Sequence, residues 1–373
     1  MKIVLCGPAF TEEIENSLSD ASLAAGRFLR TMEKNLRALG VEYYRALYIT
    51  NRVKQDGDEI KITELCKKNN DICVFKDKSI VASVYKFQNE LLSKIDSETI
   101  VLFYNYCYAY IGLVDSIRKK GGKVCLIYAD QTEPKEEHNI IKKVLLHGVE
   151  RDLKKFNKAV VLTDKLKRKL HKNCKVEVLH GGLDLSRFVT FRMQCDKKDK
   201  LVIMYTGALS YVTGVDVLLE ALKQISCSNI EVWITGKGEL EKDIIKAAEY
   251  DRRIKYLGCL PDEVYDKKLR EADIFVNPRN MSLPQNQNNF PSKVLEYLAS
   301  GRLVVSSRFS GSEDFENNFI FYDGGVDSLA DALSFTIKEY SEKREKIYLE
   351  NREKAKEYDW QNQAKKILYF LES

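Results

Sequence analysis

The chain has 373 residues, of which 44% are hydrophobic, 10% aromatic and 31% charged, and only 6 are proline. This length predicts two domains, and this composition excludes disordered and fibrous proteins. Sixty basic and 55 acidic residues give a formal net charge of +5, which is small for the length and argues against a protein that coats nucleic acid.

The cysteines and histidines do not have the pattern of a metal site. Nine cysteines and four histidines are scattered along the chain, and the closest cysteine pair, Cys66 and Cys73, lacks metal-ligand spacing. Cys6 and Cys125 lie in apolar runs, which is typical of buried thiols. We therefore expect a reduced, cytoplasmic protein without a metal. No apolar run approaches the ~18 residues needed to span a bilayer, and residues 1–6 are too short for a signal peptide. Any membrane contact is expected to be peripheral.

Short apolar runs alternate with helical patterns in the first half of the chain. Between the first two runs, Phe28, Leu29, Met32 and Leu36 recur at helical spacing, and Gly40 ends that predicted helix. This alternation is typical of a parallel sheet covered by helices on both faces, although residues 51–97 fit it less clearly. The predicted strands are 2–6, 41–49, 99–103, 123–128, 159–162 and 176–179.

The second half repeats the alternation after a seam at Gly181-Gly182 and the hydrophilic residues 195–200. The tail at 340–356 is densely charged, and a stripe from Trp360 to Leu371 then predicts an amphipathic helix that needs a surface to cover it. We predict two doubly wound α/β domains with a cleft between them, at 1–190 and 191–350, and a terminal helix at 351–373 that packs on the first domain. The second-half strands are predicted at 201–205, 230–234, 274–276 and 303–306, and the helices at 215–225, 240–248 and 292–299.

Polar and glycine-containing segments follow four of the second-domain elements, at 205–209, 235–238, 277–279 and 288–293. In open α/β sheets, ligands bind at the carboxyl ends of strands and near helix N-termini. Glycines let backbone N–H groups approach a phosphate, and Lys237, Arg279 and Lys293 can neutralise it. A single glycine after a strand usually marks a turn, but four such segments converging predict an anion-binding site.

The helix that begins near Pro291 has a polar arc. At about 100° per residue, Ser292, Lys293 and Glu296 fall on one side, while the apolar residues face the sheet. A lysine and a glutamate three residues apart are also common as a surface pair on any helix. The position of this arc at the strand ends favours ligand binding at a cleft surface.

These segments resemble the donor domain of the family-4 glycosyltransferases. Residues 205–222 are similar to its opening, 230–240 to its second strand and glycine loop, and 254–278 to the segment that follows. The run Phe-Pro-Ser-Lys-Val-Leu-Glu-Tyr-Leu-Ala-Ser-Gly at 290–301 is similar to the helix that closes the family's E-x7-E motif. Residues 178–188, which end in Arg187-Phe188, look like its interdomain segment. The resemblance covers most of 175–310 and is fainter in the first half, at 25–28 and Asp130.

The resemblance implies the GT-B fold, with two Rossmann-like domains facing each other across a cleft and a C-terminal helix that crosses back to the first domain. It implies a nucleotide-sugar donor on the second domain, with Glu296 holding the ribose hydroxyls, because a carboxylate can accept from two vicinal hydroxyls. The other residues expected at the donor are Ser292, Arg279, Lys237, Gly207, Gly236, Thr206, Asn289 and Phe290.

The chain departs from the family pattern at charged positions. Asn288 stands where the first motif glutamate is expected, and Ala208 and Thr213 replace the two usual diphosphate cations. A leaving nucleoside diphosphate needs its charge neutralised, and without a metal the protein must supply cations. Arg279, Lys293 and Lys237 are the candidate replacements, and Lys293, Asn288 and Asp130 are the predicted catalytic residues.

On the acceptor side, Asp130 ends a predicted strand and could orient or deprotonate an acceptor hydroxyl, or it could cap the following turn. Gly7, Gly26, Tyr104 and Asn105 are the other expected acceptor-side residues, although aromatics after a strand are more often core. Basic stretches at 142–155 and 165–175 are either a solvated surface or a contact with anionic lipid.

The predicted function is transfer of a hexosyl-type sugar from a UDP- or GDP-linked donor to a hydroxyl of a glycan or lipid-linked acceptor. We expect retention of configuration, no metal and no cofactor beyond this co-substrate. The expected setting is cell-surface polysaccharide or glycoconjugate assembly in the cytoplasm, at the inner face of the plasma membrane if the acceptor is lipid-linked. Two alternatives stay open: a nucleotide-sugar epimerase or hydrolase on the same fold, and a non-catalytic nucleotide-sugar-binding protein.

Overall fold

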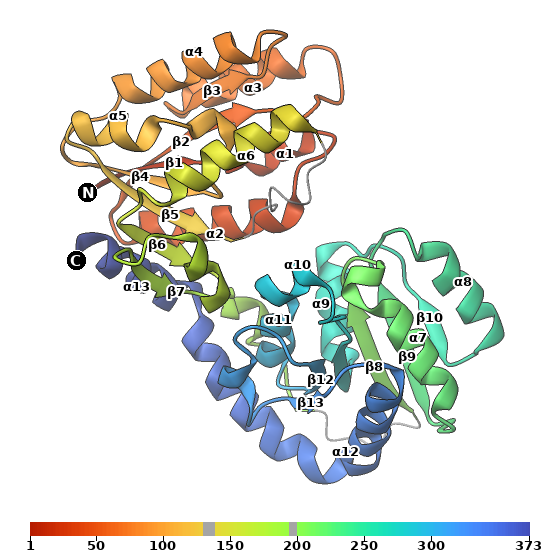
Figure 1. Cartoon of the computed structure of the whole chain (residues 1–373). Coiled ribbons are helices and arrows are strands. Elements are labelled where there is room, and N and C mark those ends of the chain that lie inside the picture. The colour runs from red at the N-terminus through yellow and green to blue at the C-terminus, as the bar shows by residue number, and fades with distance from the viewer. Residues whose placement is uncertain (130–138, 194–199) are drawn as a thin grey trace. The chain divides into compact units, whose positions relative to one another are not determined.

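The computed structural model describes residues 1–129, 139–193 and 200–373. These form two compact units, the first made of Met1–Gly181 with Trp360–Ser373 and the second of Gly182–Asp359 (Figure 1). Each unit is built on one sheet whose strands all pair in parallel.

The sheet of the first unit has seven strands in the order β3-β2-β1-β4-β5-β6-β7. The chain turns from one half of the sheet to the other between β1 and β4, and such a switch leaves a crevice at the carboxyl ends of the two strands. The strands are β1 (Lys2–Cys6), β2 (Glu42–Ile49), β3 (Ile72–Phe75), β4 (Thr99–Tyr104), β5 (Lys123–Tyr128), β6 (Lys158–Val161) and β7 (Lys175–Val178).

Helices cover both faces of this sheet and bury two apolar clusters. One cluster joins the sheet to α4 (Ile80–Ser93), α5 (Leu113–Lys119) and α6 (Ile140–Leu153). The other joins the opposite face to α1 (Glu12–Asn16), α2 (Leu23–Ala38), α3 (Asp58–Lys68) and α13 (Trp360–Glu372). Coverage on both faces explains why the strands are continuous apolar runs.

The terminal helix α13 belongs to the first unit. Its buried residues Trp360, Ala364, Ile367 and Leu371 lie in the same cluster as the apolar face of α2, and the Trp360 ring meets the edge of Phe28 at 5.0 Å between centroids. The amphipathic stripe in the sequence therefore covers a sheet face that α2 covers only in part.

The second unit has six strands in the order β10-β9-β8-β11-β12-β13, with its switch between β8 and β11. Its strands are β8 (Leu201–Thr206), β9 (Ile230–Thr235), β10 (Ile254–Tyr256), β11 (Ile274–Asn277), β12 (Leu303–Ser307) and β13 (Ile320–Tyr322). The helices α7 (Val215–Gln224), α8 (Glu241–Tyr250) and α12 (Val326–Ala355) pack on one face, and α9 (Asp262–Glu271) and α11 (Lys293–Ser300) on the other. The short α10 (Pro284–Asn288) precedes α11.

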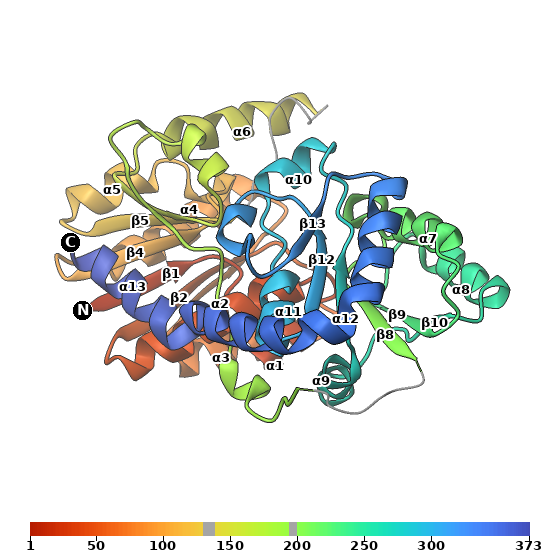
Figure 2. The same cartoon turned by 90° about the horizontal axis from the view of Figure 1, so that it is seen from below.

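The chain passes between the units twice in neighbouring positions. The N–H of Leu183 donates to the carbonyl of Tyr358 at 2.7 Å, just after the chain first leaves unit one and just before it returns. Figure 2 shows α12 as a long blue helix that leads toward α13. The predicted divisions are at 190 and 351, whereas the compact units divide after Gly181 and before Trp360. The second division lies later than predicted because α12 carries its charged half to Ala355.

Three strands have no counterpart among the predicted strands. β3 is four residues long and lies in the segment 51–97, and β10 and β13 are three residues long. All three are edge strands, and such short strands have too few residues to show an apolar pattern.

Candidate functional site

Backbone atoms of two glycine-containing loops line the switch point of the second sheet. β8 ends at Thr206 and β9 at Thr235, and the N–H of Gly207 donates to the carbonyl of Thr235 at 3.1 Å. Gly236 has a φ of +143°, and a Cβ placed on it would lie 1.8 Å from the carbonyl oxygen of Gly207. Only glycine allows these two loops to approach so closely, so their peptide groups can face a ligand.

A second glycine brings an arginine to the same edge. Gly214 precedes α7 with a φ of +73°, and a Cβ there would lie 1.8 Å from the carbonyl of Pro278. The close approach holds Arg279 against the start of α7, where unpaired N–H groups of the first turn favour anions. Tyr205 lies between Arg279 and the loop after β8, because its hydroxyl donates to the carbonyl of Ala208 at 2.6 Å and its phenol is an electrostatic neighbour of Arg279.

The Arg279 side chain is a half-buried cation. Desolvation lowers the pKa of its guanidinium, which nevertheless stays protonated at neutral pH. No ion pair found within the described ranges of the chain involves Arg279, whereas Arg187 and Lys293 contact Glu296 and Arg302 donates to backbone carbonyls. A partly desolvated arginine without an ion pair is suited to binding an anionic ligand.

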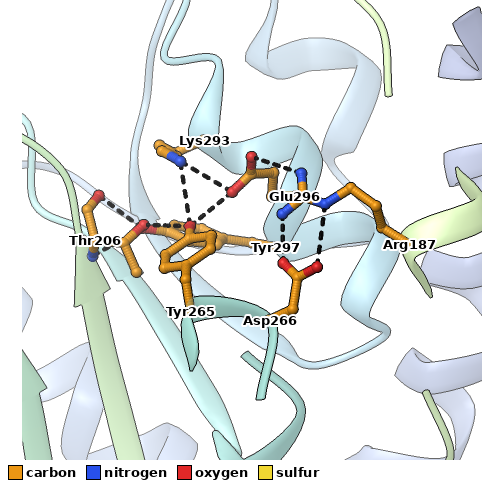
Figure 3. A network of polar contacts seen from close by, with 7 residues as sticks. All are labelled: Arg187, Thr206, Tyr265, Asp266, Lys293, Glu296 and Tyr297. Carbon is orange, nitrogen blue, oxygen red and sulfur yellow. Dashed lines mark hydrogen bonds and ion pairs between the residues drawn. The ribbon is translucent and has the colours of Figure 1, made fainter. Parts of the chain in front are cut away.

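The first turn of α11 carries a dense polar cluster (Figure 3). Lys293 Nζ lies 3.0 Å from Glu296 Oε2, and the Tyr265 hydroxyl donates to the same oxygen at 2.6 Å. Arg187 approaches the other oxygen, Oε1, at 3.5 Å and pairs more closely with Asp266 Oδ1 at 2.5 Å. Glu296 Oε1 therefore has one long contact and retains the capacity to accept a hydroxyl proton.

The Glu296 carboxylate is charged at any physiological pH. Burial by itself would raise the pKa of Glu296, but the charges of Lys293 and Arg187 and the hydrogen bond from Tyr265 outweigh burial and lower it to about 2. The side chain is only 8% exposed, which differs from the cleft-surface carboxylate expected from the sequence.

Two tyrosines connect this cluster to the end of β8. The Tyr297 hydroxyl lies 3.0 Å from Thr206 Oγ1 and accepts from the Thr206 N–H at 3.2 Å, while its ring stacks on Phe275 at 4.4 Å between centroids. The Tyr265 hydroxyl also lies 3.2 Å from Thr206 Oγ1. Burial raises the pKa of both phenols, so they stay neutral and act as hydrogen-bonding groups.

The structure brings most of the predicted donor-side residues to one edge of this sheet. Thr206 ends β8, and Gly207 and Gly236 begin the loops after β8 and β9. Ser292 precedes α11, and Lys293 and Glu296 are in direct contact. Asn288 ends α10 and, like Asn289, is half-buried, while Lys237 is exposed. Phe290 lies in the aromatic core, 5.4 Å from Phe309 between ring centroids, so its ring serves packing.

The predicted acceptor-side residues lie in the first unit and divide into two groups. Gly7 and Tyr104 are neighbours at the switch between β1 and β4, and Asn105, with a φ of +50°, accepts from the Ala129 N–H at 2.8 Å. Gly26 lies inside α2, where a Cβ would come 2.2 Å from Glu15 Oε1, so the absence of a side chain there serves helix packing. Asp130 lies outside the described residues.

Other predicted features of the first unit have structural partners. Tyr106 and Tyr110, which follow β4 in the sequence, are buried in the core. In the basic stretches, Lys169 pairs with Glu150 at 3.2 Å and Lys155 with Asp152 at 2.8 Å.

Arg187, Tyr265 and Asp266 belong to the site but were not predicted to. Arg187 appears in the sequence only as part of the interdomain resemblance, and Tyr265 and Asp266 lie on a charged helix within the resembling segment 254–278 without being singled out. Tyr265 lies at an apolar position of its helix, which indicates burial, but such a position is equally typical of a residue of the hydrophobic core.

Two parallel α/β sheets, each with a switch point, and a terminal helix that returns to the first unit define the GT-B fold. Comparison with solved structures agrees: the Anabaena protein Alr3699/HepE, solved in complex with UDP, aligns over 100% of both chains with a TM-score of 0.70 at 13% identity. Residues 200–339 match the family model described as "Glycosyl transferases group 1".

Curated relatives of the chain are also named glycosyltransferases. An uncharacterized glycosyltransferase of Methanocaldococcus jannaschii is 22% identical over 52% of this chain and 53% of its own length. The amylovoran biosynthesis glycosyltransferase AmsK of Erwinia amylovora is 28% identical over 43% of this chain and 41% of its own. The matched regions thus span about half the length of these relatives or less. Within the described part of the chain, no helix has the length and apolar character needed to cross a membrane.

Proposed function

We propose that the chain is a glycosyltransferase that moves a hexosyl-type sugar from a nucleoside-diphosphate sugar to a hydroxyl of a glycan or lipid-linked acceptor. The observation that carries the proposal is the polar edge of the second sheet. There a half-buried arginine that forms no ion pair with any described residue, two glycine loops and a charged glutamate lie in the region that matches the group 1 glycosyltransferase model.

Each group has a role in holding such a donor. Glu296 accepts a ribose hydroxyl on Oε1, the oxygen with only one long contact. Arg279 neutralises the diphosphate beside Gly207 and Ala208, and so replaces the cation that the family resemblance leads one to expect at Ala208. Lys293 already contacts Glu296, and its ammonium lies close enough to the helix N-terminus to add to the same field. We propose uridine diphosphate as the first nucleotide to test, because HepE was solved with UDP.

The reaction moves charge toward these cations. The bond between the anomeric carbon and the diphosphate oxygen breaks, the acceptor oxygen bonds to the anomeric carbon, and the acceptor proton leaves to the diphosphate or to a carboxylate such as Asp130. Negative charge on the leaving oxygen grows in the transition state, where fixed cations contribute most. Retention of configuration and independence of metal are part of the proposal and extend the family resemblance.

The proposed setting is polysaccharide or glycoconjugate assembly, with the acceptor presented in the cytoplasm or at the inner face of the plasma membrane. The name of the relative AmsK, a biosynthesis glycosyltransferase, supports the first part. The acceptor and the linkage are left to the experiment.

The test begins with calorimetric titration of UDP and GDP into the full chain, followed by incubation with a panel of nucleotide sugars. Binding of one nucleoside diphosphate and formation of a glycosylated acceptor would support the proposal. Release of altered free sugar without an acceptor product would identify an epimerase or hydrolase instead. Binding with neither product would identify a non-catalytic binder, and absence of all nucleotide binding would contradict the donor site.

A further inference from the structure

Two helices of the first unit carry large apolar side chains that point to solvent. On α4 these are Ile80, Val81 and Tyr85, and on α6 they are Ile140, Ile141 and Val144. The six side chains are between 43% and 81% exposed. They are not part of the sheet contact, because α4 buries Phe87 and Leu91 and α6 buries Val149 and Leu153 in the core.

Both sets lie at the beginning of their helices and at the same edge of the sheet. β3 ends at Phe75 before α4, and β5 ends at Tyr128 before α6. Helices that connect parallel strands run back along the sheet, so both begin at its carboxyl edge. Figure 1 shows α4 and α6 running in roughly the same direction on this unit.

The two helices flank one segment on one face of the sheet. Gln88 of α4 donates to the carbonyls of Ala109 and Ile111, at 2.9 and 3.2 Å. On α6, a Cβ placed on Gly148 would lie 3.1 Å from the Ile111 Cδ1 atom. The apolar first turns are therefore parts of one surface, which we name the α4–α6 tip and define by the six residues above.

Lysines surround the tip. Lys76, Lys78 and Lys86 are exposed around the start of α4, with Asp77 as the acidic residue among them, and Lys142 and Lys143 are exposed within the first turn of α6. Apolar residues that enter a bilayer interface beside lysines that meet anionic headgroups are the combination that binds membrane surfaces. By contrast, the exposed apolar residues Ile245 and Tyr250 lie on α8, a helix of mixed charge with three acidic and two basic residues.

We propose that the α4–α6 tip docks on a membrane surface that contains anionic phospholipid. This inference deepens the proposed function, on which it rests only for the idea that the acceptor is lipid-linked. Membrane contact is then made by the start of α4 and α6 at the carboxyl edge of the sheet, the edge where Gly7 and Tyr104 lie. The basic stretch at 165–175 is a separate feature and is not required.

The test is co-sedimentation of the full chain with vesicles of phosphatidylcholine alone and of phosphatidylcholine mixed with phosphatidylglycerol. Wild-type chain should bind the mixed vesicles, and added salt should weaken binding. Val81→Ser with Tyr85→Ser, Ile141→Ser with Val144→Ser, and Lys142→Glu with Lys143→Glu should each reduce partition by about tenfold. The matched control is Ile245→Ser with Tyr250→Ser on α8, which should bind like wild type.

Three outcomes would overturn the inference. The wild-type chain could bind neither kind of vesicle, or the tip variants could bind vesicles as well as wild type does. The third outcome is that the α8 control variant loses as much vesicle binding as the tip variants. A wild-type chain that is dimeric, with tip variants that are monomeric and vesicle binding absent, would assign the tip to a second copy of the chain. UDP titration of the same variants keeps the two proposals apart, because tip substitutions should leave nucleotide affinity unchanged even if membrane binding is lost.

Discussion

A buried carboxylate is stable only if charges and hydrogen bonds replace the water it has lost. Glu296 has three such partners, in Lys293, Arg187 and Tyr265. Arg279 is half-buried and forms no ion pair among the described residues, so its charge is available to an anionic ligand. At the scale of single residues the site thus combines one anion already neutralised and one cation that is not.

Substitution of Arg279 by alanine should weaken UDP binding. Loss of a charge-assisted hydrogen bond costs about 1.5–3 kcal/mol, which is a factor of roughly 10–100 in affinity. The thermal unfolding midpoint should change little, because no described carboxylate loses an ion pair when Arg279 is removed. Calorimetric titration measures the effect, and Arg279→Lys should restore part of it.

The matched control for Arg279 is Lys237, an exposed lysine on the neighbouring loop. Lys237→Ala should alter affinity by less than about twofold, because an exposed charge is screened. If Lys237→Ala abolished binding while Arg279→Ala did not, the diphosphate cation would have been misassigned.

Glu296→Gln should destabilise the second unit at neutral pH. The amide leaves Lys293 without its carboxylate partner, while Arg187 keeps only Asp266. Because Lys293 is partly exposed, we expect a cost of about 1–3 kcal/mol, less than for a fully buried pair. The carboxyl has a pKa of about 2 in the folded state against an ordinary 4.5, so its stabilisation is complete above about pH 4.5 and is lost as pH falls toward 2. Urea unfolding at a series of pH values measures this. The difference in unfolding free energy between wild type and Glu296→Gln should narrow as the pH falls from about 4.5 toward 2. A difference that stays constant would contradict the low pKa.

Tyr265→Phe should cost about 1.5–3 kcal/mol of unfolding free energy, because the hydroxyl donates to a charged oxygen at 2.6 Å. It should also weaken UDP binding, since Glu296 loses a group that orients it. Tyr250→Phe on α8 is the control, because that side chain is 81% exposed. Equal behaviour of the two variants in denaturant would show that the Tyr265 hydroxyl does not hold Glu296.

At the scale of elements, the site depends on how closely the loops after β8 and β9 approach. Gly236→Ala should force these loops apart, because its Cβ would collide with the Gly207 carbonyl at 1.8 Å and its φ is +143°. We expect a stability loss above about 2 kcal/mol and strongly reduced UDP affinity.

A control substitution at Gly258 separates the effect of backbone strain from the effect of a steric collision. It also has a positive φ, +65°, but a Cβ there would meet no atom within 4 Å. Gly258→Ala should therefore cost only about 1–2 kcal/mol and leave UDP affinity near that of wild type. Equal loss of affinity in both variants would mean that the contact between the loops is not what shapes the site.

At the scale of the whole molecule, the last helix, α13, belongs to the first unit, which contains the N-terminal part of the chain. Trp360→Ala should remove a buried aromatic from the cluster between α13 and α2 and cost the first unit about 3–5 kcal/mol. UDP binding by the second unit should be retained. Calorimetric scans with and without UDP would show this, with the ligand raising only the unfolding temperature of the second unit. If the Trp360→Ala chain lost UDP affinity in proportion to its loss of stability, the expectation that the two units unfold independently would be contradicted.

The sequence by itself determined the class of fold, because strands buried on both faces must be continuous apolar runs and the helices between them must be amphipathic. It also placed Thr206, Gly207, Gly236 and Glu296 together, since the carboxyl ends of neighbouring parallel strands meet at one edge. Only the tertiary structure decided which charges act on one another. Arg187 reaches Glu296 across 109 positions of sequence, and the position of Arg279 at the start of α7 depends on the close approach of Gly214 to Pro278. A Coulomb interaction depends on distance and on burial, and neither quantity follows from the order of residues along the chain.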